Sequence, residues 1–119
     1  MASAYLRTSL DRAVVARVTA SGAKEKNDLG VVENSVGFYL ADVADTAEGA
    51  FCVAADKALF PKKTGVTINA GDDVYYDAVQ EEVNLTNTNR PCGTCLYGAA
   101  SDATTVLIDF KQESSGATY

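Results

Sequence analysis

Between Ile68 and Phe110 the sequence alternates short runs of β-prone residues with tight polar turns. The runs cover residues 74–76, 83–85, 92–99 and 104–110, and they are rich in the β-branched and aromatic residues that favour strands. The turns contain Gly, Asn, Asp and Ser, which tolerate positive φ or bond their own backbone. No stretch here has room for a helix of ordinary length, about 11 residues. This region therefore predicts a set of short strands.

The rest of the chain continues the same pattern. We expect strands at 13–20, 30–32, 36–43 and 48–54, the last two forming a hairpin, and a short extended piece that ends at Pro61. The chain then has about eight to ten short strands, spaced at roughly 8–12 residues, as in β-sandwiches and β-barrels. The predicted fold class is all-β: a small β-barrel or β-sandwich of short antiparallel strands with an extended N-terminal arm.

A displacement of 56 residues reveals a possible internal repeat. It superimposes Gly37 on Gly93, Leu40 on Leu96, Val43 on Ala99, Ala44 on Ala100, and Ala47 on Ala103. Both segments read as a strand, a small-residue turn with Asp, and a second strand. We therefore expect two similar hairpins that face each other. A half of this size is too small to fold alone.

Length and charge restrict the classes of partner. A chain of 119 residues forms one domain. Its net charge of −6 makes it a poor nucleic-acid binder, since phosphate neutralisation needs clustered Lys and Arg. No apolar run is long enough for a membrane span, and the N-terminus lacks the apolar core of a signal peptide. We expect neither a nucleic-acid nor a membrane partner, and three free thiols in a reducing compartment.

The pair Cys92-Gly-Thr-Cys95 is the most conspicuous candidate for chemistry. In a redox site the first Cys lies at a helix N-terminus, which lowers its pKa. Here a strand is predicted, and residues i and i+3 of a strand point to opposite faces, so we expect the two sulfurs not to meet. With Cys52 on another strand, we interpret all three as packing thiols. A depressed pKa of Cys92 would instead favour a redox enzyme.

Other catalytic and metal sites have little support. The chain has no His, so the commonest general base is missing, and a zinc site would lack four ligands. It also has no phosphate-binding loop. Five carboxylates cluster in sequence and could hold Ca²⁺ loosely, although their spacing matches no EF-hand loop. They are Asp72, Asp73, Asp77, Glu81 and Glu82. We predict a protein that is not an enzyme, with no catalytic residues, no cofactor and no metal.

The N-terminal segment differs in charge from the rest. Residues 1–17 carry three Arg and one Asp, a net charge of +2, so residues 18–119 carry −8. Apolar side chains interleaved with Arg suit an interface. The candidate contact residues are Tyr5, Leu6, Arg7, Leu10 and Arg12. We predict an arm at 1–17, a folded domain at 18–111 and a flexible tail at 112–119; the alternative is that the arm is an ordinary first strand.

Several short segments follow one another in a set order. They are Gly37, Leu40-Ala41-Asp42, Glu48-Gly49, Leu59-Phe60-Pro61-Lys62, Ala70-Gly71-Asp72-Asp73-Val74-Tyr75-Tyr76-Asp77, Gly93, and Ala99-Ala100-Ser101-Asp102-Ala103-Thr104-Thr105-Val106. In this order, over roughly residues 30–110, they resemble the small capsid cement (decoration) proteins of tailed bacteriophages. Tyr76 stands where Trp is common in that family, and Cys95 where a small apolar residue is common. The arm and the tail lie outside the pattern.

This resemblance implies a structural virion protein, made in the host cytoplasm and placed on the outer capsid surface. Such proteins are small β-barrels or β-sandwiches that assemble as trimers or dimers, bridge major capsid protein subunits, and resist the pressure of packaged DNA. The expected partners are therefore the phage major capsid protein and further copies of this chain, a trimer being favoured. Two alternatives remain: an enzyme module, such as a redox module using Cys92 and Cys95, or another virion adaptor protein.

Overall fold

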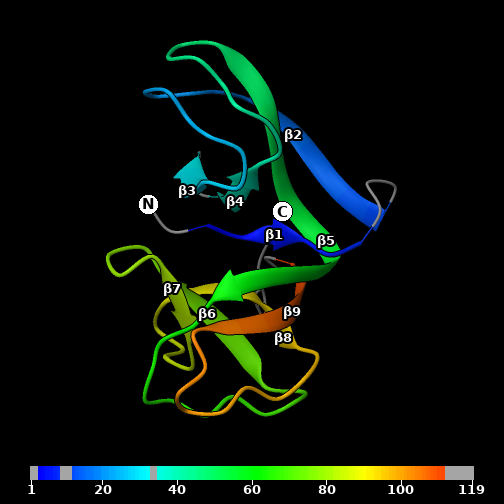
Figure 1. Ribbon diagram of the computed structural model, residues 1–119, viewed down its shortest axis with the longest axis vertical. Helices are drawn as coiled ribbons and strands as arrows, with labels where there is room; N and C mark the ends of the chain where they lie inside the picture. The colour runs from blue at the N-terminus through cyan, green and yellow to red at the C-terminus, as the bar shows by residue number, and fades with distance from the viewer. Residues whose placement is uncertain (1–2, 9–11, 33–34, 112–119) are drawn as a thin grey trace.

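The computed structural model describes residues 3–8, 12–32 and 35–111 (Figure 1). That part of the chain contains nine strands and no α-helix, so the all-β prediction is confirmed. The strands are β1 (Tyr5–Leu6), β2 (Ala13–Thr19), β3 (Leu29–Val32), β4 (Ser35–Tyr39), β5 (Glu48–Pro61), β6 (Asp73–Asp77), β7 (Glu82–Asn84), β8 (Arg90–Cys95) and β9 (Thr105–Phe110). No helix in these residues could cross a membrane.

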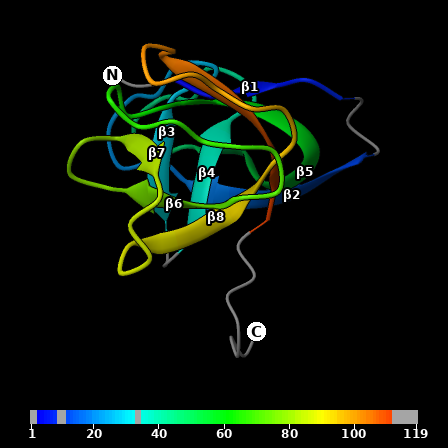
Figure 2. The ribbon, with the colours of Figure 1, turned by 90° about the horizontal axis from the view of Figure 1, so that it is seen from below.

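All nine strands belong to one curled antiparallel sheet, which forms a half-barrel. Its main order is β3-β4-β5-β9-β8-β6-β7, and β1 and β2 attach to β5 beside this path. Figure 2 shows the strands wrapping around a shared interior. Side chains from both ends of the sheet meet there, so the curl gives the small domain a single main core.

The long strand β5 joins the two parts of the sheet. Its first half pairs with β2 and β4, and its second half pairs with β1 and β9. The sequence predicted a strand at 48–54 and a separate short piece before Pro61. The intervening Ala-Ala-Asp-Lys has low β propensity, and the register with β9 shifts there, between Ala55 and Ala58. The strand nevertheless continues through this irregularity, because neighbours pair with it on both sides.

Two strands end earlier than predicted, and for the same reason. β4 ends at Tyr39 and β8 at Cys95, because the residues that follow leave the ladder to form isolated bridges. Val43 bridges to Lys24 in the first segment, and Ala99 bridges to Ile68 in the second. Val43 and Ala99 are equivalent positions of the predicted repeat, because they are 56 residues apart. The predicted internal repeat is therefore visible in the hydrogen bonding.

The main core is built around three phenylalanines. Phe38 lies 6.0 Å from both Phe60 and Phe110 between ring centroids, and the latter two are 4.8 Å apart. All three rings are fully or almost fully buried. A second, smaller cluster lies on the other face of β4, where Tyr39 packs against Phe51 at 5.0 Å. Consecutive residues of one strand thus serve two clusters, as the alternation of a strand requires.

Candidate functional site

The N-terminal residues that the structure describes are fixed to their own chain. Tyr5 and Leu6 pair with the second half of β5, and the Arg7 N–H donates to the Lys57 carbonyl at 3.0 Å. On the other side, the Ala4 N–H donates to the Asn27 carbonyl at 3.0 Å. Ala4 is fully buried in the main core. β1 therefore lies between β5 and the turn at 24–28.

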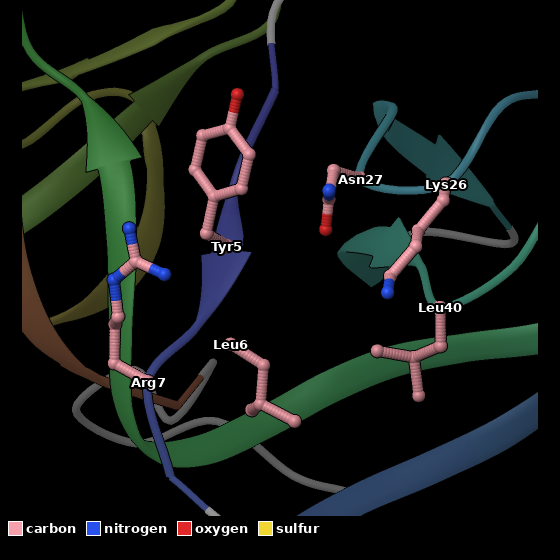
Figure 3. A pocket seen from close by; sticks show the side chains of 6 residues that line it. All are labelled: Tyr5, Leu6, Arg7, Lys26, Asn27 and Leu40. Atoms are coloured by element: carbon pink, nitrogen blue, oxygen red, sulfur yellow. The ribbon is translucent and has the colours of Figure 1, made fainter.

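An open hollow of about 360 Å³ lies along β1 (Figure 3). Its lining residues are Tyr5, Leu6, Arg7, Lys26, Asn27 and Leu40. Leu6 and Leu40 are partly buried and supply apolar walls, whereas Arg7 and Lys26 are exposed cations. The volume is at the lower end of the roughly 300–1,000 Å³ that is usual for ligand pockets, so the hollow suits one or two side chains. We call it the β1 hollow.

The two cations of the β1 hollow form no ion pair with an acidic side chain of the described residues. The ion pairs within the described residues join Arg12 to Asp56, Arg17 to Glu48, and Lys111 to Asp109. The Arg7 guanidinium lies 5.4 Å from the centroid of the Tyr5 ring, a cation–π distance. This contact positions Arg7 without neutralising it.

One carboxylate does lie near Lys26. Asp42 accepts the backbone N–H of Lys26 at 2.9 Å, through its side-chain oxygen Oδ1. That hydrogen bond holds the turn and leaves the ammonium group of Lys26 without an ion pair to a described residue. The hollow therefore carries positive charge on a chain whose net charge is −6.

The predicted contact residues are only partly brought together. Tyr5, Leu6 and Arg7 line the β1 hollow. Leu10 lies outside the described residues. Arg12 lies elsewhere and pairs with Asp56, its Nε at 2.5 Å from the carboxylate, with both side chains at least half exposed. Such a surface pair contributes about 0–1 kcal/mol. The role of all five residues in binding remains a proposal.

Sequence reasoning missed the other wall of the hollow. Lys26 and Asn27 fall between the predicted strands at 13–20 and 30–32, and Leu40 falls within the predicted strand at 36–43. The available signal is Asn27 itself, whose φ of 76° marks a tight turn that Asn tolerates. The contact between this turn and β1 depends on a hydrogen bond across more than twenty residues, which no local pattern reveals.

The acidic residues around β6 act in turns. Asp77 accepts the N–H groups of Val79 at 2.9 Å and Gln80 at 3.1 Å, and Asp72 accepts that of Asn69 at 2.9 Å. No group of three or more potential metal ligands occurs among the residues that the structure describes. These carboxylates therefore organise loops, and Asp77 in particular fixes the loop between β6 and β7.

The three cysteines are free and buried, which agrees with packing thiols. The expectation that Cys92 and Cys95 point to opposite faces is wrong, since both lie in the main core. The cause is a β-bulge. Val74 pairs with Gly93 and the next residue, Tyr75, pairs with Pro91, so Cys92 is an extra residue and the alternation shifts by one.

Burial also sets the chemistry of the thiols. It raises the pKa of Cys52 to about 11, and it raises the pKa of Cys92 and of Cys95 as well. A redox nucleophile needs the opposite shift, because the thiolate is the reactive form. The sulfur atoms therefore behave as apolar filling and give the redox alternative no support.

Comparison with known families adds the missing context. A family model described as phage cement protein matches residues 10–110. The chain belongs to the phage cement protein family. This phage cement protein is therefore a phage structural protein. The match spans β2 to β9 and leaves out Tyr5, Leu6 and Arg7. A comparison with curated proteins found no significant match.

Proposed function

We propose that this protein binds the outer surface of the phage head and stabilises the contacts between major capsid protein subunits. The observation that carries this proposal is the family match over residues 10–110. The protein is made in the host cytoplasm and becomes part of the virion. Several copies attach together as a homo-oligomer, a trimer in preference to a dimer. Weak contacts from each copy then add up to firm attachment.

The edge of β2 supports an assembly role. Among the described residues, β2 pairs with β5 on one side only. It exposes two apolar side chains, Val14 at 58% and Val15 at 41%. A free apolar edge strand is prone to pair with another chain, so proteins usually cover or charge it. An oligomer or a capsid would provide such a cover.

We assign the arm to attachment or to contacts between subunits, through Tyr5, Leu6, Arg7, Leu10 and Arg12. The domain from residue 18 onward folds without the first part of the arm in this proposal. β1 contributes only two paired residues, so its removal costs little pairing. The boundary at 17/18 falls inside β2, and residues 13–17 are paired with β5. The arm that can be removed therefore ends before β2.

The test uses empty, expanded capsids of the phage that encodes this protein. We expect the wild-type protein to bind them and to raise their melting temperature. Deletion of residues 2–12 should reduce binding or oligomer mass while lowering the free energy of unfolding by only about 1–2 kcal/mol, since Ala4 and Leu6 lose their contacts. Failure of the wild-type protein to bind would refute the cement proposal. A truncated protein that binds normally as an intact oligomer would refute the role of the arm.

A further inference from the structure

The loop between β6 and β7 has an unexplained feature. Val79, at its tip, is 85% exposed, the highest value among the large apolar side chains that the structure describes as exposed. After Gln80 come Glu81, the last residue of the loop, and Glu82, the first residue of β7, and neither forms an ion pair within the described residues. The loop thus presents an apolar side chain beside two negative charges. We call it the Val79 loop, residues 78–81.

The Val79 loop is held in one conformation. The Asp77 carboxylate accepts the N–H groups of Val79 and Gln80. The Glu81 N–H donates to the Asp77 carbonyl at 2.7 Å, and Glu81 adopts a φ of 57°, in the left-handed region. A loop with these internal bonds loses little conformational entropy when it binds, which favours association. It is therefore a preformed projection.

The β1 hollow has the complementary chemistry. Leu6 and Leu40 offer apolar walls, and Arg7 and Lys26 offer two cations that form no ion pair within the part of the chain that the structure describes. In Figure 3 the two leucines lie across from each other, and the Lys26 ammonium group extends toward Leu40. A ligand for this site carries an apolar side chain next to a carboxylate. The Val79 loop carries both.

We propose that the Val79 loop of one copy binds in the β1 hollow of a second copy. Val79 packs between Leu6 and Leu40, and the Glu81 carboxylate pairs with Arg7 and Lys26. Figure 2 shows the loop between β6 and β7 projecting from the molecule away from β1, so the loop meets the hollow of another copy. Contacts of this loop-to-hollow kind close into rings when the rotation between copies permits it.

The test measures the dissociation constant of the full-length oligomer by sedimentation velocity and native mass spectrometry. We expect Val79→Ser and Glu81→Gln on the loop, and Arg7→Gln and Lys26→Gln in the hollow, each to weaken self-association, by about tenfold for the central contacts. High salt should weaken the wild-type oligomer more than the oligomer of the Arg7→Gln, Lys26→Gln double variant. Salt screens the ion pairs of the wild-type contact, and the double variant lacks the two cations that form them. Tyr97→Ser, at a 65% exposed apolar residue of another loop, is the matched control and should assemble as wild type.

A charge exchange separates a direct contact from a loss of folding. Arg7→Glu and Glu81→Arg should each weaken the oligomer, and the two changes in one chain should restore much of it. A mixture of an Arg7→Glu, Lys26→Glu protein with a Val79→Ser, Glu81→Gln protein should form one-to-one pairs, because the first has an intact loop, the second has an intact hollow, and the neutral loop of the second has no attraction for the acidic hollow of the first. Neither protein should assemble alone.

Three results would overturn the proposal. The wild-type protein could be a monomer at every concentration. The loop and hollow variants could assemble as the wild type does. Hollow variants could lose capsid binding while their oligomer is unchanged, in which case the hollow holds a segment of the capsid protein instead. Because self-association is measured without capsids, each of these results is distinct from a failure of the cement function.

Discussion

The two halves of the repeat share a backbone plan but differ in what is added to it. In the first half, Gly30 pairs with Gly37 across β3 and β4. In the second, Val74 pairs with Gly93 across β6 and β8. Seven positions separate the first pair and nineteen the second, so the second half holds an insertion of twelve residues between matching strands. β7 and the Val79 loop lie within that interval.

Each half begins with an entry turn, residues 25–28 in the first and 69–72 in the second, and the two turns have the same hydrogen bonds. Asp28 accepts the Glu25 N–H, and Asp72 accepts the Asn69 N–H, both at 2.9 Å. The third residue of each turn has positive φ, 76° at Asn27 and 90° at Gly71. Different residues thus produce one turn geometry, because its requirements are a carboxylate at the fourth position and a tolerated left-handed residue at the third.

The difference between the halves coincides with the two surfaces of our proposed contact between copies. The first half acquires β1, which packs beside the turn at 24–28 and creates the β1 hollow. The second half acquires the Val79 loop. The shared parts bury side chains and close the sheet, whereas the added parts place Tyr5, Arg7 and Val79 on the surface. Arg7 and Glu81 form no ion pair with any residue that the structure describes. Our proposed contact between copies joins the two additions and leaves the repeated scaffold unchanged.

The matching glycines of β4 and β8 should show the largest effect. A Cβ at Gly93 would collide with the Asp109 carbonyl oxygen, and φ there is 148°, so Gly93→Ala strains a rigid backbone. A Cβ at Gly37 would collide with the Cys52 carbonyl oxygen and would also lie 2.5 Å from the Phe51 ring. We expect Gly93→Ala to lower the free energy of unfolding by about 3 kcal/mol or more, and Gly37→Ala by about 2 kcal/mol, because both sites meet a backbone carbonyl but only Gly93 also has a positive φ.

Urea unfolding monitored by circular dichroism measures both changes. Gly30→Ala is the matched control, since a Cβ there has nothing within 4 Å. It should unfold within about 0.5 kcal/mol of wild type, the usual range for a surface change. If Gly93→Ala and Gly30→Ala were equally stable, the close approach of β8 to β9 would not be what requires a glycine.

Much of this fold follows from the sequence, and the reasons for the misses are specific. Short strands and turns are local properties, so the all-β class and the repeat could be read from residue types. The bulge at Cys92 could not, because it depends on which residue of β6 faces each residue of β8. A one-residue shift of this kind reverses the face of a side chain, and for that reason the orientation of Cys92 and Cys95 was mispredicted.

The candidate site was less predictable than the fold. Tyr5, Leu6 and Arg7 stood out by composition, and the structure places them on one side of the β1 hollow. Lys26 and Leu40 complete the hollow from two distant segments, so only the folded chain brings them together. Arg12 has the same composition signal as Arg7, yet it forms a surface ion pair with Asp56. Charge pattern alone does not separate these two arginines.

Each half ends with a closing turn, residues 44–47 in the first and 100–103 in the second, and different groups stabilise the two turns. We expect a change in the second turn to have an effect of intermediate size on stability. The first turn is held by backbone bonds between Ala20 and residues 46–47, at 3.0 and 2.9 Å. The second is held by the buried ammonium group of Lys62, which donates to the carbonyls of Lys63, Ser101 and Ala103 at 2.7, 3.4 and 3.3 Å. Lys62→Met keeps the apolar stem and removes the ammonium donor, while the Ser101 carbonyl keeps its hydrogen bond from the Gly65 N–H.

We expect Lys62→Met to lower the free energy of unfolding by about 2 kcal/mol, because the hydrogen bonds from a buried, charged donor to these carbonyls are lost. Thermal unfolding of the full chain measures it. Lys63→Met changes the adjacent exposed lysine and serves as the control, with little expected change. Equal melting temperatures for the two variants would mean that water replaces the Lys62 ammonium group at no cost.

The smallest effect should come from the third residue of the two entry turns. Gly71→Ala places a Cβ at a φ of 90°, with no neighbour within 4 Å, so the cost is conformational and about 1 kcal/mol. Asn27→Gly relieves a residue at 76° and should change the free energy of unfolding by no more than about 0.5 kcal/mol. Chemical unfolding of both variants gives the comparison.

Self-association of the Asn27→Gly protein adds a functional measurement to this pair. Asn27 lines the β1 hollow through its side chain and bonds Ala4 through its backbone carbonyl. Glycine retains that carbonyl, so β1 should stay in place and the oligomer should be weakened by a few-fold at most. A large loss of assembly at unchanged stability would assign the Asn27 amide a direct contact with the partner copy. A large loss of stability would instead show that the turns of the two halves are not energetically equivalent.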